Sequence, residues 1–215
     1  LVQPARQSHA HRGTLPGGRQ LPSGTGRADG GALGADGRGA AARGPGFAQG
    51  VPAGGYAWWY LDALNPEGTA GVTIIAFVGS VFSPYYAWAR ARSAQTVPED
   101  FCALNVAIYS PRGKLWTMTE RGHGALDRSP DHFALGPSHL TWTGNALRIA
   151  LDERTMPLPG RVRGHIELTP HALTDAPFAL DAAGRHMWWP LAPKAHVKVS
   201  LEAPAWRWEG PGYLD

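Results

Sequence analysis

Apolar side chains alternate with polar ones in several short segments, and this period-two pattern constrains the fold more than any other feature of the sequence. Between residues 147 and 152, Leu, Ile and Leu alternate with Arg, Ala and Asp. This spacing places the two sets of side chains on opposite faces of an extended strand, so that one face can be buried. The apolar positions of the four clearest series are Leu104, Val106 and Ile108; Leu147, Ile149 and Leu151; Val162, Ile166 and Leu168; and Val197, Val199 and Leu201.

Turn-forming residues separate these segments at short intervals. Ser110–Gly113 reads Ser-Pro-Arg-Gly between two strand-like segments, which is typical of a hairpin, and Thr143–Asn145 precedes another segment. Many short strands joined by such turns predict an all-β fold, an antiparallel sandwich or barrel. Residues 87–96 form the one helix candidate, and their pattern is weak.

The first 45 residues differ in composition from the rest of the chain. They contain no aromatic residue and few large apolar ones. Such a segment buries too little apolar surface to offset the entropy lost on ordering. We therefore expect a disordered Gly/Arg/Ala-rich head at 1–45 and a β-domain at 46–215. A start outside the native reading frame would give the same composition, and this hypothesis stays open.

Composition also argues against several classes of function. The net charge is only +3 and no concentrated basic block occurs, so nucleic acid is not an expected partner. Cys102 is the single cysteine, which excludes an internal disulfide or a cysteine metal cluster, and its apolar surroundings predict a buried thiol. The longest apolar run, about residues 71–82, is shorter than the roughly 20 residues of a spanning helix. Zinc, P-loop, dinucleotide and nucleophile-elbow motifs are missing, so we expect no metal and no cofactor.

Two polar–aromatic pairs, each spaced two residues apart, are candidates for acid–base chemistry. His186 and Trp188 follow the turn at Asp181–Gly184, and Tyr213 and Asp215 stand at the end of the sequence. In an extended chain the two members of each pair share a face. A carboxyl group beside a phenol, an indole and an imidazole can form an acid–base pocket. On spacing alone, a structural His186 and a solvated Asp215 remain the alternative.

An aromatic-rich stretch, residues 54–92, is a candidate wall for an apolar ligand. Burial of apolar surface contributes about 25 cal/mol per Å², so such a wall suits a ligand without hydrogen-bonding groups. The alternative is that these rings are ordinary core residues. The candidate substrate-binding residues are Trp58, Trp59, Tyr85, Tyr86, Trp88 and Trp189.

Long runs of the sequence carry a family resemblance that covers about residues 46–215. These runs are GGYAWWYLDAL, GVTIIAFVGSVFSPYYAWAR, CALNVAIYSPRGKLWTMTERG, ALDAAGRHMWWP and GPGYLD. The chain closely resembles the carotenoid 1,2-hydratases, or hydroxyneurosporene synthases, of purple phototrophic bacteria. The resemblance implies a lipocalin-like architecture of two β-domains, of which this chain contains the first. It also implies the addition of water to the terminal C1=C2 bond of acyclic carotenoids such as neurosporene and lycopene, without an organic cofactor.

The resemblance assigns roles to the two pairs picked out by spacing. The family's implicated residues, a His and a Trp in its RHxWWP run and a Tyr and an Asp in GYLD, fall on His186, Trp188, Tyr213 and Asp215. The implied acid is Asp215, the rings of Trp188 and Tyr213 stabilise a cation, and His186 positions water or accepts its proton. The resemblance does not single out Asp62 in the aromatic stretch.

The substrate implied by the resemblance resides in a bilayer. We therefore expect peripheral contact with the cytoplasmic side of the inner or intracytoplasmic membrane, with no transmembrane segment. Arg90 and Arg92 could serve this contact, with a solvated face as the alternative. Because the family chain continues past GYLD, we expect a second β-domain downstream and weak or absent activity for the chain as given. A non-catalytic lipocalin-like carrier of carotenoid or lipid and a carbohydrate-binding β-sandwich stay open.

Overall fold

The computed structural model describes residues 44–215. Most of the expected disordered head lies outside the described residues, except for Gly44 and Pro45. Pro45 is buried, and its carbonyl accepts a hydrogen bond from Trp59 Nε1 at 2.9 Å. Phe47 follows in the core, where it packs against the rings of Trp59 and Phe133. The segment that leads into the β-domain is therefore part of its core.

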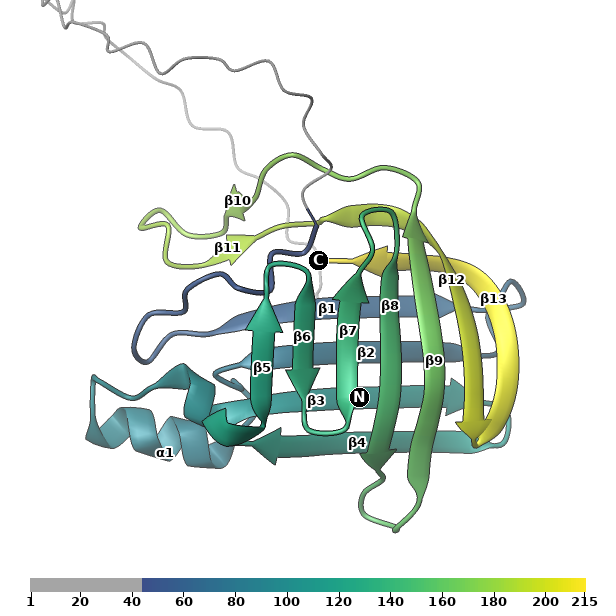
Figure 1. Ribbon diagram of the computed structural model, residues 1–215, viewed down its shortest axis with the longest axis horizontal. Coiled ribbons are helices and arrows are strands. Elements are labelled where there is room, and N and C mark those ends of the chain that lie inside the picture. The colour runs from purple at the N-terminus through teal and green to yellow at the C-terminus, as the bar shows by residue number, and fades with distance from the viewer. Residues whose placement is uncertain (1–43) are drawn as a thin grey trace, which may run out of the picture. The chain divides into compact units, whose positions relative to one another are not determined.

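Eleven strands form one antiparallel sheet, in the order β4-β3-β2-β1-β13-β12-β9-β8-β7-β6-β5 (Figure 1). A separate ribbon consists of β10 (Phe178–Ala179) and β11 (Met187–Trp188). The expected all-β antiparallel fold is confirmed, whereas the lipocalin-like label stays a prediction. The strands of the large sheet are β1 (Ala57–Leu64), β2 (Gly71–Val78), β3 (Cys102–Ser110), β4 (Gly113–Arg121), β5 (Leu126–Ser129), β6 (His132–Leu135), β7 (Ser138–Trp142), β8 (Leu147–Arg154), β9 (Arg161–Pro170), β12 (Ala192–Ala203) and β13 (Ala205–Leu214).

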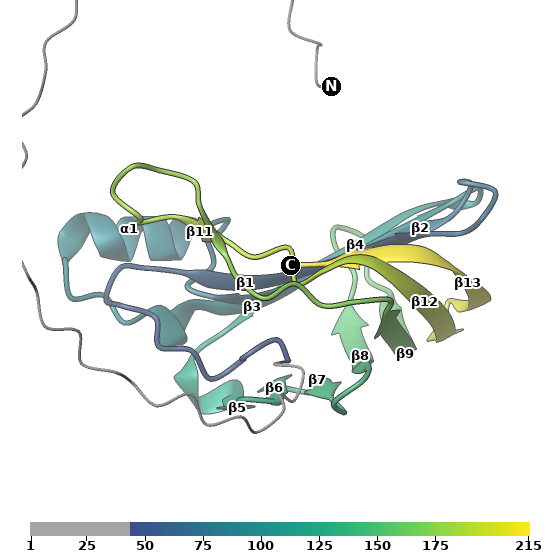
Figure 2. The same cartoon turned by 90° about the horizontal axis from the view of Figure 1, so that it is seen from above.

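The long sheet folds over itself into two layers with the apolar core between them. Figure 1 shows β1–β4 running crosswise to β5–β8, and Figure 2 shows the two layers from above. The sheet passes from one layer to the other through β13, β12 and β9. Register shifts in β12, at Ala192/Ala195 and at Leu201/Ala203, fit this bend because a bulge increases local twist and curvature.

The core confirms the alternation in the sequence. Every apolar position of the four predicted series is buried, and the intervening Arg148, Arg163 and Lys198 are exposed. The hairpin turn at Ser110–Gly113 joins β3 to β4 as predicted. Cys102 is also buried as predicted, and burial is the main cause that raises its thiol pKa to about 12.

The helix prediction for residues 87–96 is wrong in its bounds. The helix α1 runs from Pro84 to Arg92. Ser83 caps it, because its side chain accepts a hydrogen bond from the backbone N–H of Tyr86, and Pro84 suits the first turn. The aromatic stretch is thus two strands followed by a helix. No helix within residues 44–215 is long and apolar enough to cross a membrane.

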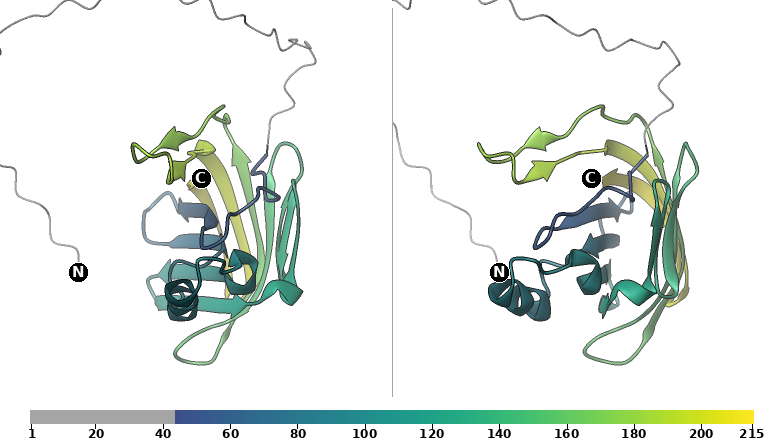
Figure 3. Two further views of the ribbon diagram at one scale, coloured as in Figure 1. Left: turned by 90° about the vertical axis from the view of Figure 1, so that its left-hand side faces the viewer. Right: turned by 60° about the vertical axis from the view of Figure 1, so that its left-hand side comes forward.

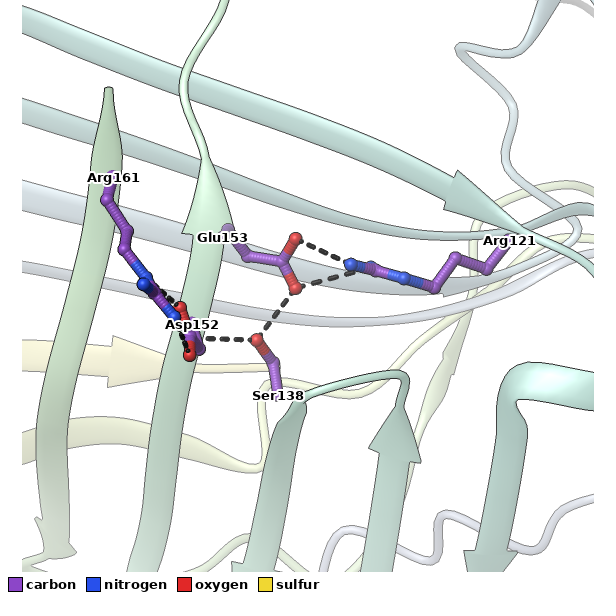
Figure 4. Close-up of polar contacts among 5 residues, drawn as sticks. All are labelled: Arg121, Ser138, Asp152, Glu153 and Arg161. Carbon is purple, nitrogen blue, oxygen red and sulfur yellow. Dashed lines mark hydrogen bonds and ion pairs between the residues drawn. The ribbon is translucent and has the colours of Figure 1, made fainter. Parts of the chain in front are cut away.

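A buried ion pair joins the two layers at β4 and β8, which are not neighbours in the sheet (Figure 4). Arg121 of β4 donates two hydrogen bonds, of 3.2 and 3.0 Å, to the carboxylate of Glu153. Glu153 is only 1% exposed and also accepts a 2.7 Å hydrogen bond from Ser138 Oγ. On the neighbouring position of β8, Asp152 pairs with the exposed Arg161. The Glu153 side chain therefore links three strands, whereas the Asp152 side chain links only β8 to β9.

Candidate active site

The outer face of the β1–β4 layer carries the candidate chemistry. In β1, Trp59, Leu61 and Ala63 are buried, which turns Tyr60 and Asp62 toward the opposite face. The helix α1 and the ribbon β10–β11 lie on this side of the layer, away from β5–β8, in both Figure 2 and Figure 3. The ribbon brings residues from late in the chain over β1 and β13.

Three of the four predicted catalytic residues form one hydrogen-bonded cluster. Trp188 Nε1 donates to Asp215 Oδ2 at 2.7 Å and lies 3.2 Å from the Tyr213 hydroxyl. The Tyr213 hydroxyl donates to the same Asp215 Oδ2 at 2.9 Å. Asp215 Oδ1 is buried and has no hydrogen-bond partner among residues 44–215. One carboxyl oxygen thus accepts two hydrogen bonds, and the other is left for a proton.

The surroundings of Asp215 favour its protonated form. Burial raises the carboxyl pKa above its ordinary value, and the negative charge of Asp62 raises it further. The hydrogen bonds from Trp188 and Tyr213 act in the opposite direction without cancelling the effect of burial. The Tyr213 pKa is raised as well, first by burial and then by its contact with Asp215. Tyr213 therefore stays a neutral hydrogen-bond donor.

The fourth predicted residue, His186, has a different partner. Its Nδ1 lies 2.7 Å from the Tyr56 hydroxyl, and the two rings stack at 5.9 Å. Tyr56 in turn stacks on Trp58 at 5.2 Å. The backbone N–H of His186 donates to Asp181, and this bond is the main cause that lowers the Asp181 pKa. No hydrogen bond joins His186 to the Trp188 cluster within the described part of the chain.

A pocket of about 470 Å³ opens beside the Trp188 cluster. Its lining includes Tyr56 and Met187, which sequence reasoning did not select. Trp189 is held in the wall because its Nε1 donates to Thr174 Oγ1 at 2.9 Å. The predicted residues that line the pocket are Trp58, Trp59, Trp188, Trp189 and Asp215.

The three predicted aromatic residues of α1 do not line this pocket. Tyr86 is buried against Phe101, and its hydroxyl donates to the Gly55 carbonyl, so it is a core residue. Tyr85 and Trp88 are 70% and 63% exposed. The reason is that the segment is helical. Neighbouring residues of a helix point in different directions, so these rings do not form one continuous wall with β1.

The sequence matches the model of the carotenoid hydratase CrtC family over residues 74–215. The chain belongs to this carotenoid hydratase family. It is 54% identical over 203 residues to the acyclic carotenoid 1,2-hydratase of Thiocapsa roseopersicina, an alignment that covers 94% of this chain and 50% of that protein. It is 51% identical over 172 residues to the enzyme of the same name from Rubrivivax gelatinosus, covering 80% of this chain and 42% of that protein.

A third acyclic carotenoid 1,2-hydratase, from Cereibacter sphaeroides, is 45% identical over 143 residues, which are 66% of this chain and 49% of that protein. The chain thus spans about half the length of the curated relatives it matches. Among solved structures, a Nitrosomonas europaea protein described as AttH aligns over 74% of this chain and 50% of its own, with 15% identity and a TM-score of 0.44. That likeness is too distant to support an inference.

In this hydratase-family chain, sequence reasoning missed two tyrosines of the site, Tyr56 and Tyr60. Tyr56 comes just before β1 and Tyr60 lies in it. Each stands two residues before another site residue, Trp58 or Asp62, and therefore on the same face of the strand. Period-two spacing through this run was the signal that could have found them. Burial raises the pKa of Tyr60 to about 12, which keeps its phenol protonated. Among the described residues, no group of three or more His, Cys, Asp or Glu side chains is arranged to hold a metal.

Proposed function

We propose that the protein to which this chain belongs is an acyclic carotenoid 1,2-hydratase, which adds water to the terminal C1=C2 bond. Family membership supports the reaction class. The observation that carries the proposal is the state of Asp215, a carboxyl group with one doubly hydrogen-bonded oxygen and one unpartnered oxygen beside an aromatic pocket. An isolated alkene has no acidic proton and no basic heteroatom, so its hydration needs a strong, correctly placed proton donor.

The first step is transfer of the proton of the Asp215 carboxyl group to C2. The electron pair of the C1=C2 bond forms the new C–H bond, and a tertiary carbocation remains at C1. A carboxyl group donates such a proton more readily when its surroundings raise its pKa, and burial raises the pKa of Asp215 above its ordinary value. Once the proton has left, the hydrogen bonds that Trp188 and Tyr213 donate to Oδ2 stabilise the Asp215 carboxylate.

The second step is capture of the cation by water. The ring faces of Trp188 and Trp58 stabilise positive charge at C1. The water oxygen bonds to C1, and its surplus proton passes to His186, giving a tertiary alcohol. His186 Nδ1 is bound to Tyr56, so Nε2 is the nitrogen available for this proton. His186 then releases this proton to solvent while Asp215 takes one up, so both residues return to their starting state and the net change is the addition of one water.

The pocket supports recognition of one end of a polyene. A volume of about 470 Å³ lies in the range of small-molecule sites, and its lining includes Trp58, Trp188 and Trp189 together with the polar Gln49, Asp175 and Arg185. Binding of a hydrocarbon depends on apolar area, at about 25 cal/mol per Å². The end group therefore enters the pocket, and the rest of the polyene, as in neurosporene or lycopene, extends away from it. We propose as well that the full-length protein contains a second β-domain downstream, because this chain spans about half the length of its curated relatives.

The helix α1 supports a peripheral site on the inner or intracytoplasmic membrane, where such a substrate resides. Tyr85 and Trp88 project from it, and Phe82 just before it is also exposed. Arg90 and Arg92 lie in its last turn, and the Arg92 guanidinium stacks over the Trp88 ring at 4.6 Å. Exposed Trp and Tyr favour the membrane interface, and arginines are attracted to anionic lipid headgroups.

The experiment that tests the proposed function is hydration of an acyclic carotenoid by the full-length protein and its Asp215→Asn variant. We expect a 1-hydroxy product from the wild type and none from Asp215→Asn, because an amide cannot donate the proton. Carotenoid binding, followed by the absorption spectrum, should persist in the variant. The matched control is Asp127→Asn, at an exposed position of β5, and it should keep full turnover. Turnover by Asp215→Asn would contradict the acid role.

A further inference from the structure

The tripeptide Tyr-Leu-Asp occurs twice in this chain, and the fold pairs the two copies. One copy is Tyr60–Asp62 in β1, and the other is Tyr213–Asp215 at the end of β13. They run antiparallel with Leu61 opposite Leu214 and Asp62 opposite Tyr213. Tyr60 and Asp215 exchange both backbone hydrogen bonds, each of 2.9 Å. The two tripeptides are thus related by a local two-fold axis through the leucine pair.

This pairing gathers two phenols and two carboxylates on one face. Both leucines are buried in the core, so the flanking Tyr and Asp side chains all point to the outer face. Each phenol donates to the carboxylate of its own tripeptide, Tyr60 to Asp62 at 3.1 Å and Tyr213 to Asp215 at 2.9 Å. The two phenol rings meet edge to face at 6.3 Å. Two equivalent acid–phenol units therefore share one small area.

The ribbon β10–β11 makes the two units unequal. Trp188 donates a hydrogen bond to Asp215, whereas Tyr60 is the only side chain hydrogen-bonded to Asp62 within residues 44–215. Neither carboxylate takes part in an ion pair in that range. When two nearby carboxyl groups have different surroundings, one tends to remain ionised while the other remains protonated.

We propose that Asp62, held by Tyr60, is a second carboxylate whose negative charge helps to keep Asp215 in its protonated form. Asp62 is a positioning residue in this scheme, because it acts through Asp215 and not on the substrate. The groups bonded to the two carboxylates or opposite them in the sheet are Tyr60 on β1, Thr73 on β2, Tyr213 on β13 and Trp188 on the ribbon, and none of them is cationic. Arg185 and Asp175 also line the pocket beside Asp215, and the Arg185 guanidinium is paired with Asp181. The charge of Asp62 therefore acts on Asp215 without a compensating positive charge from these neighbours.

The direction of the effect follows from like-charge repulsion. The negative charge of Asp62 raises the pKa of Asp215, in addition to the larger effect of burial. Removing that charge lowers the Asp215 pKa, so a smaller fraction of the enzyme carries the catalytic proton at neutral pH. The inference rests on the proposed function, but it concerns the protonation of Asp215, which can be observed without turnover.

The test compares the pH dependence of hydration in the full-length wild type, Asp62→Asn and Asp62→Glu. For Asp62→Asn we expect the alkaline limb of the rate profile to move to lower pH. The rate at neutral pH then falls and recovers in acid. Asp62→Glu restores the charge and should restore the wild-type limb. If Asp62→Asn loses rate equally at every pH, or if its alkaline limb stays where it is in the wild type, Asp62 has only a structural role and the inference is refuted.

A spectroscopic titration separates this inference from the proposed function. The carboxylic C=O stretch that disappears in Asp215→Asn reports protonated Asp215, and we expect its titration midpoint to fall in Asp62→Asn. Asp127→Asn, at an exposed position on β5, serves as the control and should leave the midpoint unchanged. If the wild type hydrates carotenoid but the midpoint does not move, the inference alone fails. If the midpoint moves but no hydration occurs, the proposed function alone fails.

Discussion

The two oxygens of Asp215 have different surroundings, and its chemistry depends on this difference. Oδ2 accepts hydrogen bonds from Trp188 and Tyr213, and Oδ1 is buried without a partner among the described residues. Because the carboxyl pKa is raised, the proton donor is present at low pH and is lost as the pH rises through that raised pKa. Hydration should therefore decline toward alkaline pH.

Tyr56→Phe is the residue-scale test of His186. The substitution keeps the ring that stacks on Trp58 and His186 but removes the hydroxyl 2.7 Å from Nδ1. Without that contact the imidazole loses its fixed tautomer and orientation, and we expect the turnover number to fall about ten- to a hundredfold with little change in KM. Steady-state kinetics measure both quantities. Tyr109→Phe, at an exposed tyrosine on β3, is the control, and an equal loss there would refute the role of Tyr56.

At the scale of elements, the strands were predictable and the helix was not. The alternation in β8, β9 and β12 follows directly from burial of one face, so spacing alone locates these strands. The helix α1 buries only Tyr86, so it has no apolar stripe for a 3.6-residue period to reveal. Its start was nevertheless marked, because Ser83 followed by Pro84 is a helix-start signal.

Two neighbouring carboxylates of β8 give a matched test of how the two layers are joined. Glu153→Ala removes a buried carboxylate and leaves Arg121 and Ser138 without their partner, so we expect the free energy of unfolding to fall by about 3 kcal/mol. Asp152→Ala breaks an ion pair of the same bidentate form with the exposed Arg161, and its effect should be much smaller. Urea denaturation followed by tryptophan fluorescence measures both. Equal losses would contradict a special role for the buried pair.

At the scale of the whole described unit, one side of the β1–β4 layer faces the core and the other carries the candidate chemistry. Spacing found the pair Tyr213 and Asp215, because they are neighbours on one strand face. It could not predict that Trp188 reaches Asp215 from the ribbon, or that Tyr56 holds His186 from 130 positions away in sequence. Contacts of this kind depend on tertiary folding, which a period in the sequence does not encode.

Membrane contact through α1 is a prediction at this same scale. In the full-length protein, replacing Tyr85 and Trp88 by Ser should weaken sedimentation with vesicles that contain anionic lipid, because both exposed rings lose their place at the interface. Hydration of detergent-solubilised carotenoid should stay unchanged, since neither ring lines the pocket. The control is Trp116→Ser, at an exposed tryptophan of β4. Unchanged vesicle binding by the α1 variant would contradict the proposal.

In the proposed mechanism, a proton from Asp215 is added to C2 of the substrate. Hydration of an acyclic carotenoid in D₂O by the full-length protein tests it most directly, because the exchangeable Asp215 proton is replaced by deuterium before reaction. We expect a 1-hydroxy product with one carbon-bound deuterium at C2 from the wild type, and no product from Asp215→Asn. A hydrated product without deuterium at C2, or labelled product from Asp215→Asn, would contradict it.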